Sequence, residues 1–164
     1  MTTDLVRRQV LRTVGRLGLT SVSGSLPAHG NSTFFQCCLH HVQRDLLAAT
    51  KEDSLLQIDL GDLRDTLKLC GSSPLSFTVT NHDADKVLDA CRDALARITT
   101  HKKAAAVVVC SGYGKSFQLS HCAEVFRVVR RAMDESTCLA LGVVFDPQLV
   151  NAMSVTWLVG APDG

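Results

Sequence analysis

The sequence of 164 residues has the length of one domain, and its composition, 46% hydrophobic, 20% charged and 5% aromatic, excludes a disordered or fibrous chain. Seventeen Lys and Arg against sixteen Asp and Glu leave a net charge of +1, without the basic excess of a dedicated nucleic-acid binder. The longest apolar runs, 104–110 and 138–145, are too short to span a membrane, so we expect no nucleic-acid partner and no membrane span.

The cysteine content and the first residues indicate a reducing compartment. Seven cysteines are an odd number and fall below the density of a disulfide scaffold, so we expect all of them to be free thiols. Residues 1–30 contain several arginines and no continuous apolar stretch, so they do not resemble a secretory signal. We therefore expect a cytoplasmic protein.

Apolar residues recur every three to four positions over residues 3–17, which predicts an amphipathic helix. Three arginines line another face of this helix: Arg8, Arg12 and Arg16. They form either a contact surface for a partner or an ordinary solvated helix face. Residues 18–32 are rich in glycine and serine and predict a linker, so the chain divides into an N-terminal helix with its linker (1–32) and one domain (33–164).

Two helices and a strand are expected next. Residues 33–50 place apolar side chains on one side and follow Ser32, which can cap a helix. A shorter helix starts at Leu60 and ends at Gly71, because glycine suits a helix C-terminus. Over 75–80, apolar residues alternate with serine and threonine, which predicts a strand with one polar face.

The rest of the chain alternates between helix and strand. Apolar side chains at helical spacing predict helices over 84–99 and 119–134. Between them, 104–110 is a continuous apolar run of strand length, which suits a strand covered on both faces. Two further strands, 137–145 and 153–160, follow the last helix.

This order of elements predicts an α/β fold. We expect a two-layer sandwich in which a four-stranded mixed β-sheet packs against helices, preceded by two helices. A turn at Asp146-Pro147 separates the last two strands, which are candidates for an antiparallel hairpin. Nine side chains of the sheet are expected to be mostly buried: Leu75, Phe77, Val79, Val107, Val109, Leu141, Val143, Val155 and Trp157.

The segment Cys110-Ser-Gly-Tyr-Gly-Lys-Ser116 lies between a predicted strand and a predicted helix, and it ends like a phosphate-binding loop. Such a loop needs a glycine five positions before Gly114, and that position is Val109. Only four residues separate Cys110 from Lys115, too few to wrap an anion. An ordinary strand-to-helix turn is therefore favoured over nucleotide binding.

Metal binding and thiol catalysis have little support. Four residues of metal-binding type lie on one predicted helix: Cys37, Cys38, His40 and His41. Only the first and last share a face, whereas a structural zinc needs four converging ligands from more than one element. Nothing places a histidine beside a thiol as a catalytic base; the histidines considered are His82, His101 and His121. We expect no metal, no cofactor and no catalytic residue.

The segment Gln57-Ile-Asp-Leu-Gly-Asp62 opens the helix that starts at Leu60. Asp59 is placed to cap this helix and Asp62 is the acid three residues later, the arrangement of a capping box, which stabilises a helix by about 1 kcal/mol. The alternative role of these two acids, which lie three residues apart at an exposed loop-to-helix junction, is to polarise a water molecule. From the residues alone, capping is favoured.

Residues 55–65, Leu-Leu-Gln-Ile-Asp-Leu-Gly-Asp-Leu-Arg-Asp, resemble the synergy loop and following helix of the tubulin/FtsZ superfamily, where FtsZ has Gly-Leu-Ile-Asn-Val-Asp-Phe-Ala-Asp-Val. Residues 104–112 resemble the FtsZ strand that ends in Thr-Gly-Gly, and Glu124-Val125 match its late Glu-Val helix. Residues 138–160 are similar to the FtsZ stretch with Asp-Pro, Val-Thr-Val and Thr-Gly.

The helix over 33–50 resembles the end of the long central helix of FtsZ, so the resemblance covers about 33–160 and implies the fold of the FtsZ C-terminal domain. The family's GTP site lies in an N-terminal domain marked by Gly-Gly-Gly-Thr-Gly-Thr-Gly, which this sequence does not contain. The resemblance therefore implies that this chain does not bind GTP in the family's way by itself.

In FtsZ polymers, the loop acids of one subunit position the hydrolytic water at the nucleotide of the next. The matching positions here are Gln57, in place of an asparagine, and the acids Asp59 and Asp62. The Pro-Gly of the family's loop is replaced by Asp53-Ser54, and the Gly-Asp before the last strand by Val150-Asn151.

The resemblance implies a non-enzymatic protein-interaction domain in a cytoskeletal setting such as cell division, at most a catalytic co-subunit of a partner's GTPase. The expected partner is an FtsZ- or tubulin-type polymer, or a copy of this chain, bound through Gln57, Asp59 and Asp62. Alternatively, the fold is reused as a scaffold of a secretion or plasmid-maintenance complex, and the arginine face of the helix over 3–17 is the contact surface.

Overall fold

The computed structural model describes residues 39–72, 74–98 and 104–160, together with Arg8 and the pairs 20–21 and 34–35. At its centre is a mixed sheet with four long strands: β3 (Leu75–Asn81), β4 (Ala105–Tyr113), β5 (Cys138–Val150) and β6 (Ala152–Gly160). Their order across the sheet is β3–β6–β4–β5. The predicted α/β class with a four-stranded mixed sheet is confirmed.

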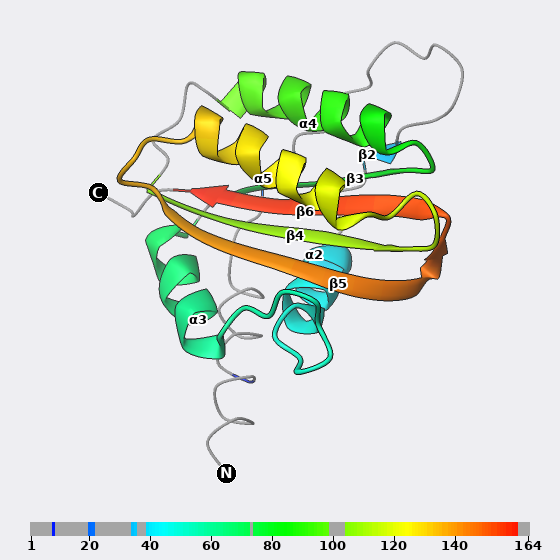
Figure 1. Cartoon of the computed structure of the whole chain (residues 1–164). Helices are drawn as coiled ribbons and strands as arrows, with labels where there is room; N and C mark the ends of the chain where they lie inside the picture. The colour runs from blue at the N-terminus through cyan, green and yellow to red at the C-terminus, as the bar shows by residue number, and fades with distance from the viewer. Residues whose placement is uncertain are drawn as a thin grey trace.

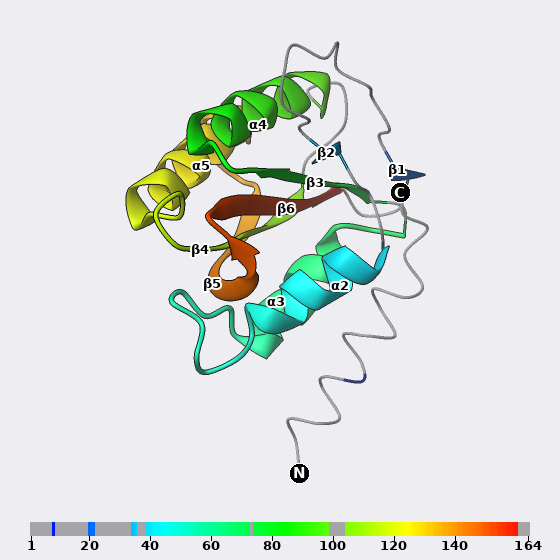
Figure 2. The ribbon, with the colours of Figure 1, turned by 90° about the vertical axis from the view of Figure 1, so that its right-hand side faces the viewer.

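Helices cover both faces of this sheet (Figures 1 and 2). They are α4 (Ala84–Ile98) and α5 (Leu119–Ala132) on one face, and α2 (Leu39–Ala48) and α3 (Leu60–Leu69) on the other. The molecule therefore has three layers where the sequence predicted two. The reason lies in β4, where Val108 and Cys110 pack in the core under α4 and α5, while Val107 and Val109 pack toward α2 and α3. The predicted covering of this strand on both faces is confirmed.

The last two strands do not form the hairpin suggested by the sequence, because β4 lies between them. β4 and β5 are parallel and joined by the α5 crossover, whereas β6 runs antiparallel to β3 and β4. β6 is buried from Ala152 to Val159, as a central strand must be. β5 carries several exposed side chains after Val144, which suits a strand at the edge.

β5 also continues through Asp146-Pro147, where a turn was predicted. Proline is tolerated there because an edge strand does not need every backbone N–H for the sheet. The chain reverses instead at Asn151, whose φ of 50° lies in the left-handed region that asparagine adopts more readily than most residues.

The first part of the chain departs further from expectation. Phe34–Phe35 form strand β2, antiparallel to β3, within the helix predicted over 33–50, and the described helix begins at Leu39. Thr20–Ser21 form β1, parallel to β3, inside the expected linker. Both segments are strands because they pair with the edge of β3. The sequence pattern did not predict this pairing, because the partner strand lies far away in the sequence. The helix predicted over 3–17 lies outside the described residues, except for Arg8, which is helical.

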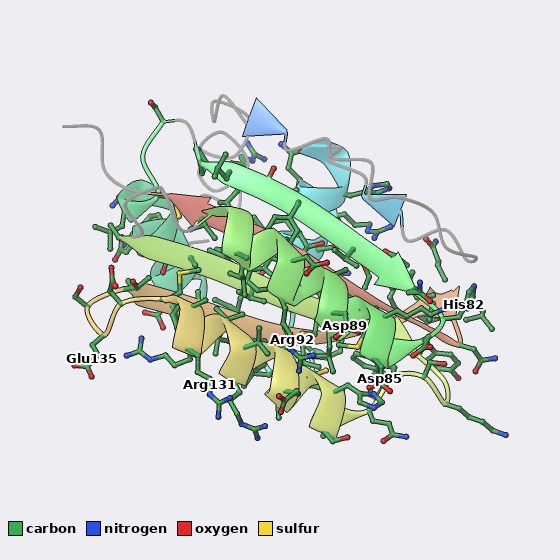
Figure 3. The ribbon with its side chains drawn as sticks, turned by 90° about the horizontal axis from the view of Figure 1, so that it is seen from above. His82, Asp85, Asp89, Arg92, Arg131 and Glu135 are labelled. Carbon is green, nitrogen blue, oxygen red and sulfur yellow. The ribbon has the colours of Figure 1, made fainter. Side chains whose placement is uncertain are left out.

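The other predicted helices are confirmed to within about two residues at each end. Of the nine sheet side chains expected to be buried, Leu75 and Leu141 are half-buried and the others are buried. Phe77 and Trp157 stack at the centre of the core, with ring centroids 5.1 Å apart. α4 and α5 lie side by side over this core (Figure 3).

The polar face of β3 is buried against β6 and α2. The hydroxyl oxygens of Thr78 and Thr156 lie 3.0 Å apart, and Thr156 Oγ1 donates to Asp45 Oδ2 at 2.5 Å. Asp45 is only 2% exposed, and its other oxygen accepts a hydrogen bond from Arg44 Nε at 3.0 Å. A buried polar contact therefore fixes α2 to the sheet beside its apolar packing.

Candidate functional site

The candidate site consists of loop 51–59 and the first turn of α3, and its base is pinned to the sheet. Ile58 N–H donates to Ala49 O at 2.8 Å, and Leu56 exchanges two backbone hydrogen bonds with Val143 of β5. Ile58 is buried over Gly142, where an added Cβ would lie 3.0 Å from Ile58 Cδ1. The glycine therefore makes room for the side chain that anchors the loop.

Asp59 caps α3, as predicted. Its backbone is extended, with φ −61° and ψ 139°, and its Oδ1 accepts the N–H of Gly61 at 2.7 Å and that of Asp62 at 3.3 Å. A Cβ on Gly61 would lie 2.9 Å from Asp59 Oδ1, so the glycine allows the cap to approach. One oxygen of the Asp59 carboxylate is thus committed to the helix start.

Gln57 is exposed, but its amide donor is turned back onto the loop. Gln57 Nε2 donates to Thr50 O at 3.0 Å and so joins the two ends of the loop. Ser54 strengthens the same turn through its hydroxyl, which donates to Ala49 O at 3.3 Å. Gln57, at the position where the resembling FtsZ loop has an asparagine, therefore has a structural contact of its own.

The structure brings the three predicted partner-binding residues together. Gln57, Asp59 and Asp62 line a groove of about 390 Å³ between α3 and β5, and the first two also border a hollow of about 530 Å³ over residues 51–53. Asp62 is exposed, and within the described part of the chain no hydrogen bond or ion pair engages its carboxylate. Of the two acids, Asp62 is therefore the one whose carboxylate oxygens are both available to a partner.

A third acid, Asp65, lines the groove one turn further along α3. Its Oδ1 accepts from Arg64 Nε at 3.0 Å and from Lys68 Nζ at 3.1 Å. The hydrogen bonds from Arg64 and Lys68 lower the pKa of the Asp65 carboxyl from its ordinary value. Because Asp65 has cationic neighbours, the uncompensated negative charge of the groove is concentrated on Asp59 and Asp62.

The other candidates are placed as follows. Arg8 is exposed, whereas Arg12 and Arg16 lie outside the described residues, so the arginine surface stays a prediction. In the suspected phosphate loop, β4 continues to Tyr113 and the chain turns at Gly114, with φ 85°. The N–H of Lys115 donates to Asn151 Oδ1 at 3.3 Å, so this backbone donor is occupied within the protein.

The described cysteines are all free: Cys70, Cys91, Cys110, Cys122 and Cys138. Burial raises the pKa of the Cys70 and Cys91 thiols to about 12, so both are protonated at neutral pH. Cys37 and Cys38 lie outside the described residues, and within those residues no cluster of three or more metal-ligating side chains is present. None of the described helices has the length and apolar character needed to cross a membrane.

One polar site was missed by the sequence analysis. Arg44, Asp45 and Lys51 border a hollow of about 510 Å³ between α2 and the far end of β5. A signal was present, because Asp45 lies three residues after Val42 and four before Ala49, which places it on the apolar face of the helix. An acid on that face opposite a strand with a threonine face indicates a buried polar contact.

Comparisons with known proteins bear on the fold. No protein-family model matches the chain, and no curated protein matches it significantly. Among solved structures, the empty FtsZ dimer of M. jannaschii matches with a TM-score of 0.61 at 18% sequence identity, over 74% of this chain and 36% of that chain. This chain has an FtsZ-like fold.

A mutant FtsZ of M. jannaschii matches with a TM-score of 0.58 at 16% identity, over 76% of this chain and 38% of that chain. A CetZ of Methanosaeta thermophila matches with a TM-score of 0.49 at 14% identity, over 77% and 37%. The chain thus spans little more than a third of the FtsZ chains that it matches. The predicted likeness to the FtsZ C-terminal domain is confirmed at the level of the fold.

Proposed function

We propose that this chain is a non-enzymatic, cytoplasmic protein-interaction domain that binds an FtsZ- or tubulin-type polymer, or copies of itself, through loop 51–59 and the first turn of α3. The observation that carries the proposal is an FtsZ-like fold that presents an exposed acidic loop at the segment resembling the synergy loop. The matched M. jannaschii structure is a dimer of FtsZ, so the fold occurs in a self-associating protein.

The state of the loop side chains favours contact over catalysis. The amide donor of Gln57 is bonded to Thr50 O, and one oxygen of Asp59 holds the start of α3. Asp62 is then the acid left to meet a partner, whereas orienting and activating a water calls for several positioned groups. The sequence also contains no glycine-rich signature of the family's GTP site.

Co-sedimentation with assembled FtsZ and GTP tests the proposal. We expect the chain to enter the pellet or to change GTP turnover, and Asp62→Asn to reduce either effect. Asp85→Asn is the matched control, because Asp85 is also an exposed first-turn acid but lies on α4, on the opposite face of the sheet (Figure 3). The proposal is overturned if the chain neither pellets nor alters turnover over a broad concentration range and is monomeric by size exclusion.

Two further outcomes distinguish the alternatives. A tenfold or larger fall in the partner's GTP turnover on Asp62→Asn, with binding intact, would make the chain a catalytic co-subunit, because an amide does not polarise water as a carboxylate does. Loss of a partner on deletion of residues 1–18, with substitutions in loop 51–59 silent, would favour the scaffold function through the arginine helix.

A further inference from the structure

β5 has an open backbone edge at its start. Cys138 N–H donates to Ala104 O at 3.0 Å, toward β4, whereas Val143 bonds Leu56 on the opposite side. Because successive residues of a strand point their backbone groups to opposite sides, the N–H and C=O groups of Leu139 and Leu141 also point away from β4. Within the described residues, no strand pairs with β5 along this stretch.

This edge lacks the features by which proteins usually protect an edge strand. Natural edges carry lysine, proline or bulges, which block the addition of a further strand. Residues 138–142 are Cys-Leu-Ala-Leu-Gly, with no charge and no proline, whereas Asp146 and Pro147 lie further along the same strand. The open stretch is thus suited to accept a strand.

The groove of about 390 Å³ described above runs between this edge and α3. Residues 138–141 form one side, and Figure 1 shows α3 below the start of β5. Leu69 of α3 is 40% exposed, and Leu139 and Leu141 are half-buried. Leu139 and Leu141 pack against the core under α4 and α5, so a strand added beside them would meet apolar side chains on that face, and Leu69 with the acids Asp59 and Asp62 on the α3 face.

We propose that this groove binds an extended segment of a protein partner in which apolar residues alternate with lysine or arginine. The segment adds to the sheet as a strand beside Leu139 and Leu141, so that main-chain hydrogen bonds supply affinity and alternate side chains supply specificity. Its basic residues meet the exposed Asp62 and Asp59. Pairing of β5 with β5 of a second copy is disfavoured, because it would bring two sets of α3 acids together.

The inference shares Asp59 and Asp62 with the proposed function, and it rests on that proposal only in treating the chain as a protein-interaction domain. Its test therefore contains no FtsZ. If FtsZ fails to bind while the peptides below bind as expected, only the polymer partner is rejected; if the peptides fail while FtsZ pelleting persists, only the groove is rejected.

Fluorescence anisotropy of the full chain with labelled eight-residue peptides is the first measurement. We expect a peptide of alternating Lys and Val to bind, and the matching peptide of alternating Glu and Val to bind about tenfold more weakly or not at all. N-methylation of every second backbone amide of the Lys-Val peptide should abolish its binding. Hydrogen exchange gives a direct readout, because the amides of Leu139 and Leu141 become protected when the Lys-Val peptide is added. Equal binding of the Lys-Val and Glu-Val peptides, or unchanged exchange at both leucines, overturns the inference.

Two variants locate the site. Leu141→Pro removes an N–H that points away from β4, a position where an edge strand tolerates proline, and it should weaken Lys-Val binding about tenfold. Asp62→Asn should weaken the same binding about two- to fivefold, as expected for an exposed charge pair, while Asp85→Asn should not change it. If Leu141→Pro does not fold, the N-methylated peptide tests the same hydrogen bonds. The proposal is refuted if a folded Leu141→Pro variant binds the Lys-Val peptide with wild-type affinity. It is also refuted if the chain binds no peptide but forms a dimer that Leu141→Pro abolishes.

Discussion

The hydrogen bond between Thr156 and Asp45 provides the sharpest test of how α2 is held. Thr156→Val keeps the side-chain volume but removes the hydroxyl that donates to the buried carboxylate at 2.5 Å. A hydrogen bond to a charged group contributes about 1.5–3 kcal/mol, and Thr78 loses its 3.0 Å hydroxyl partner at the same time. We therefore expect the free energy of unfolding to fall by about 2–3 kcal/mol.

Arg44 does not compensate for this loss, because its side chain is 45% exposed and its ion pair with Asp45 is screened by solvent. Urea unfolding followed by the fluorescence of Trp157, the sole tryptophan and fully buried, measures the change directly. For a chain of this length, the expected loss lowers the Tm by about 4–12 °C.

Thr80→Val is the matched control on the neighbouring strand. Thr80 Oγ1 donates to Ser154 Oγ at 2.9 Å, a contact between neutral groups at a half-buried position, so we expect a loss of only about 0.5–1.5 kcal/mol. Replacing both partners, as in Asp45→Leu with Thr156→Val, should cost much less than the sum of the single changes, because no buried charge is left without its donor. If Thr156→Val is no more destabilising than Thr80→Val, the assignment of a strong charge-assisted bond is refuted.

Three further predictions concern the cap, the core and the thiols. Asp59→Ala should reduce the free energy of unfolding by about 1 kcal/mol, while Asp59→Asn, which keeps an acceptor for the N–H groups of Gly61 and Asp62, should change it little; equal losses in urea unfolding would contradict the cap. Val143→Asp should destabilise by at least about 3 kcal/mol, because it places an unpaired charge at a position only 2% exposed, and a soluble variant that melts like the wild type would refute the assignment of this strand. Val150→Asp, 61% exposed on the same strand, is its control and should shift stability by no more than about 0.5 kcal/mol. At pH 8, well below the pKa of about 12 of Cys70 and Cys91, both thiols stay protonated and should react with a thiolate-selective reagent only after unfolding. The number of reactive thiols per denatured chain should be seven with or without reductant. A deficit of two without reductant would show a disulfide.

Local patterns in the sequence were sufficient to predict features whose hydrogen-bond partners lie nearby in the chain, and strands that are buried on both faces. The cap at Asp59 was predictable because its hydrogen bonds join residues two and three positions apart. The strand around Val107 was predictable because a continuous apolar run requires cover on both faces. Gln57, Asp59 and Asp62 lie within six residues of one another, so their shared position at the start of α3 followed from the chain itself.

Only the tertiary structure decided the features that depend on distant partners. Phe34–Phe35 form a strand because the edge of β3, more than forty residues away, accepts them. The place of β6 between β3 and β4 follows from its burial on both faces, and this leaves β5 at the edge with the open backbone of Leu139 and Leu141. The polar face of β3 became interior because Thr78 contacts Thr156 of β6, which in turn donates to the buried Asp45 of α2. Helical and strand periodicity report how a segment is buried but not by which element, so the order of strands and the contents of the groove are properties of the assembled fold.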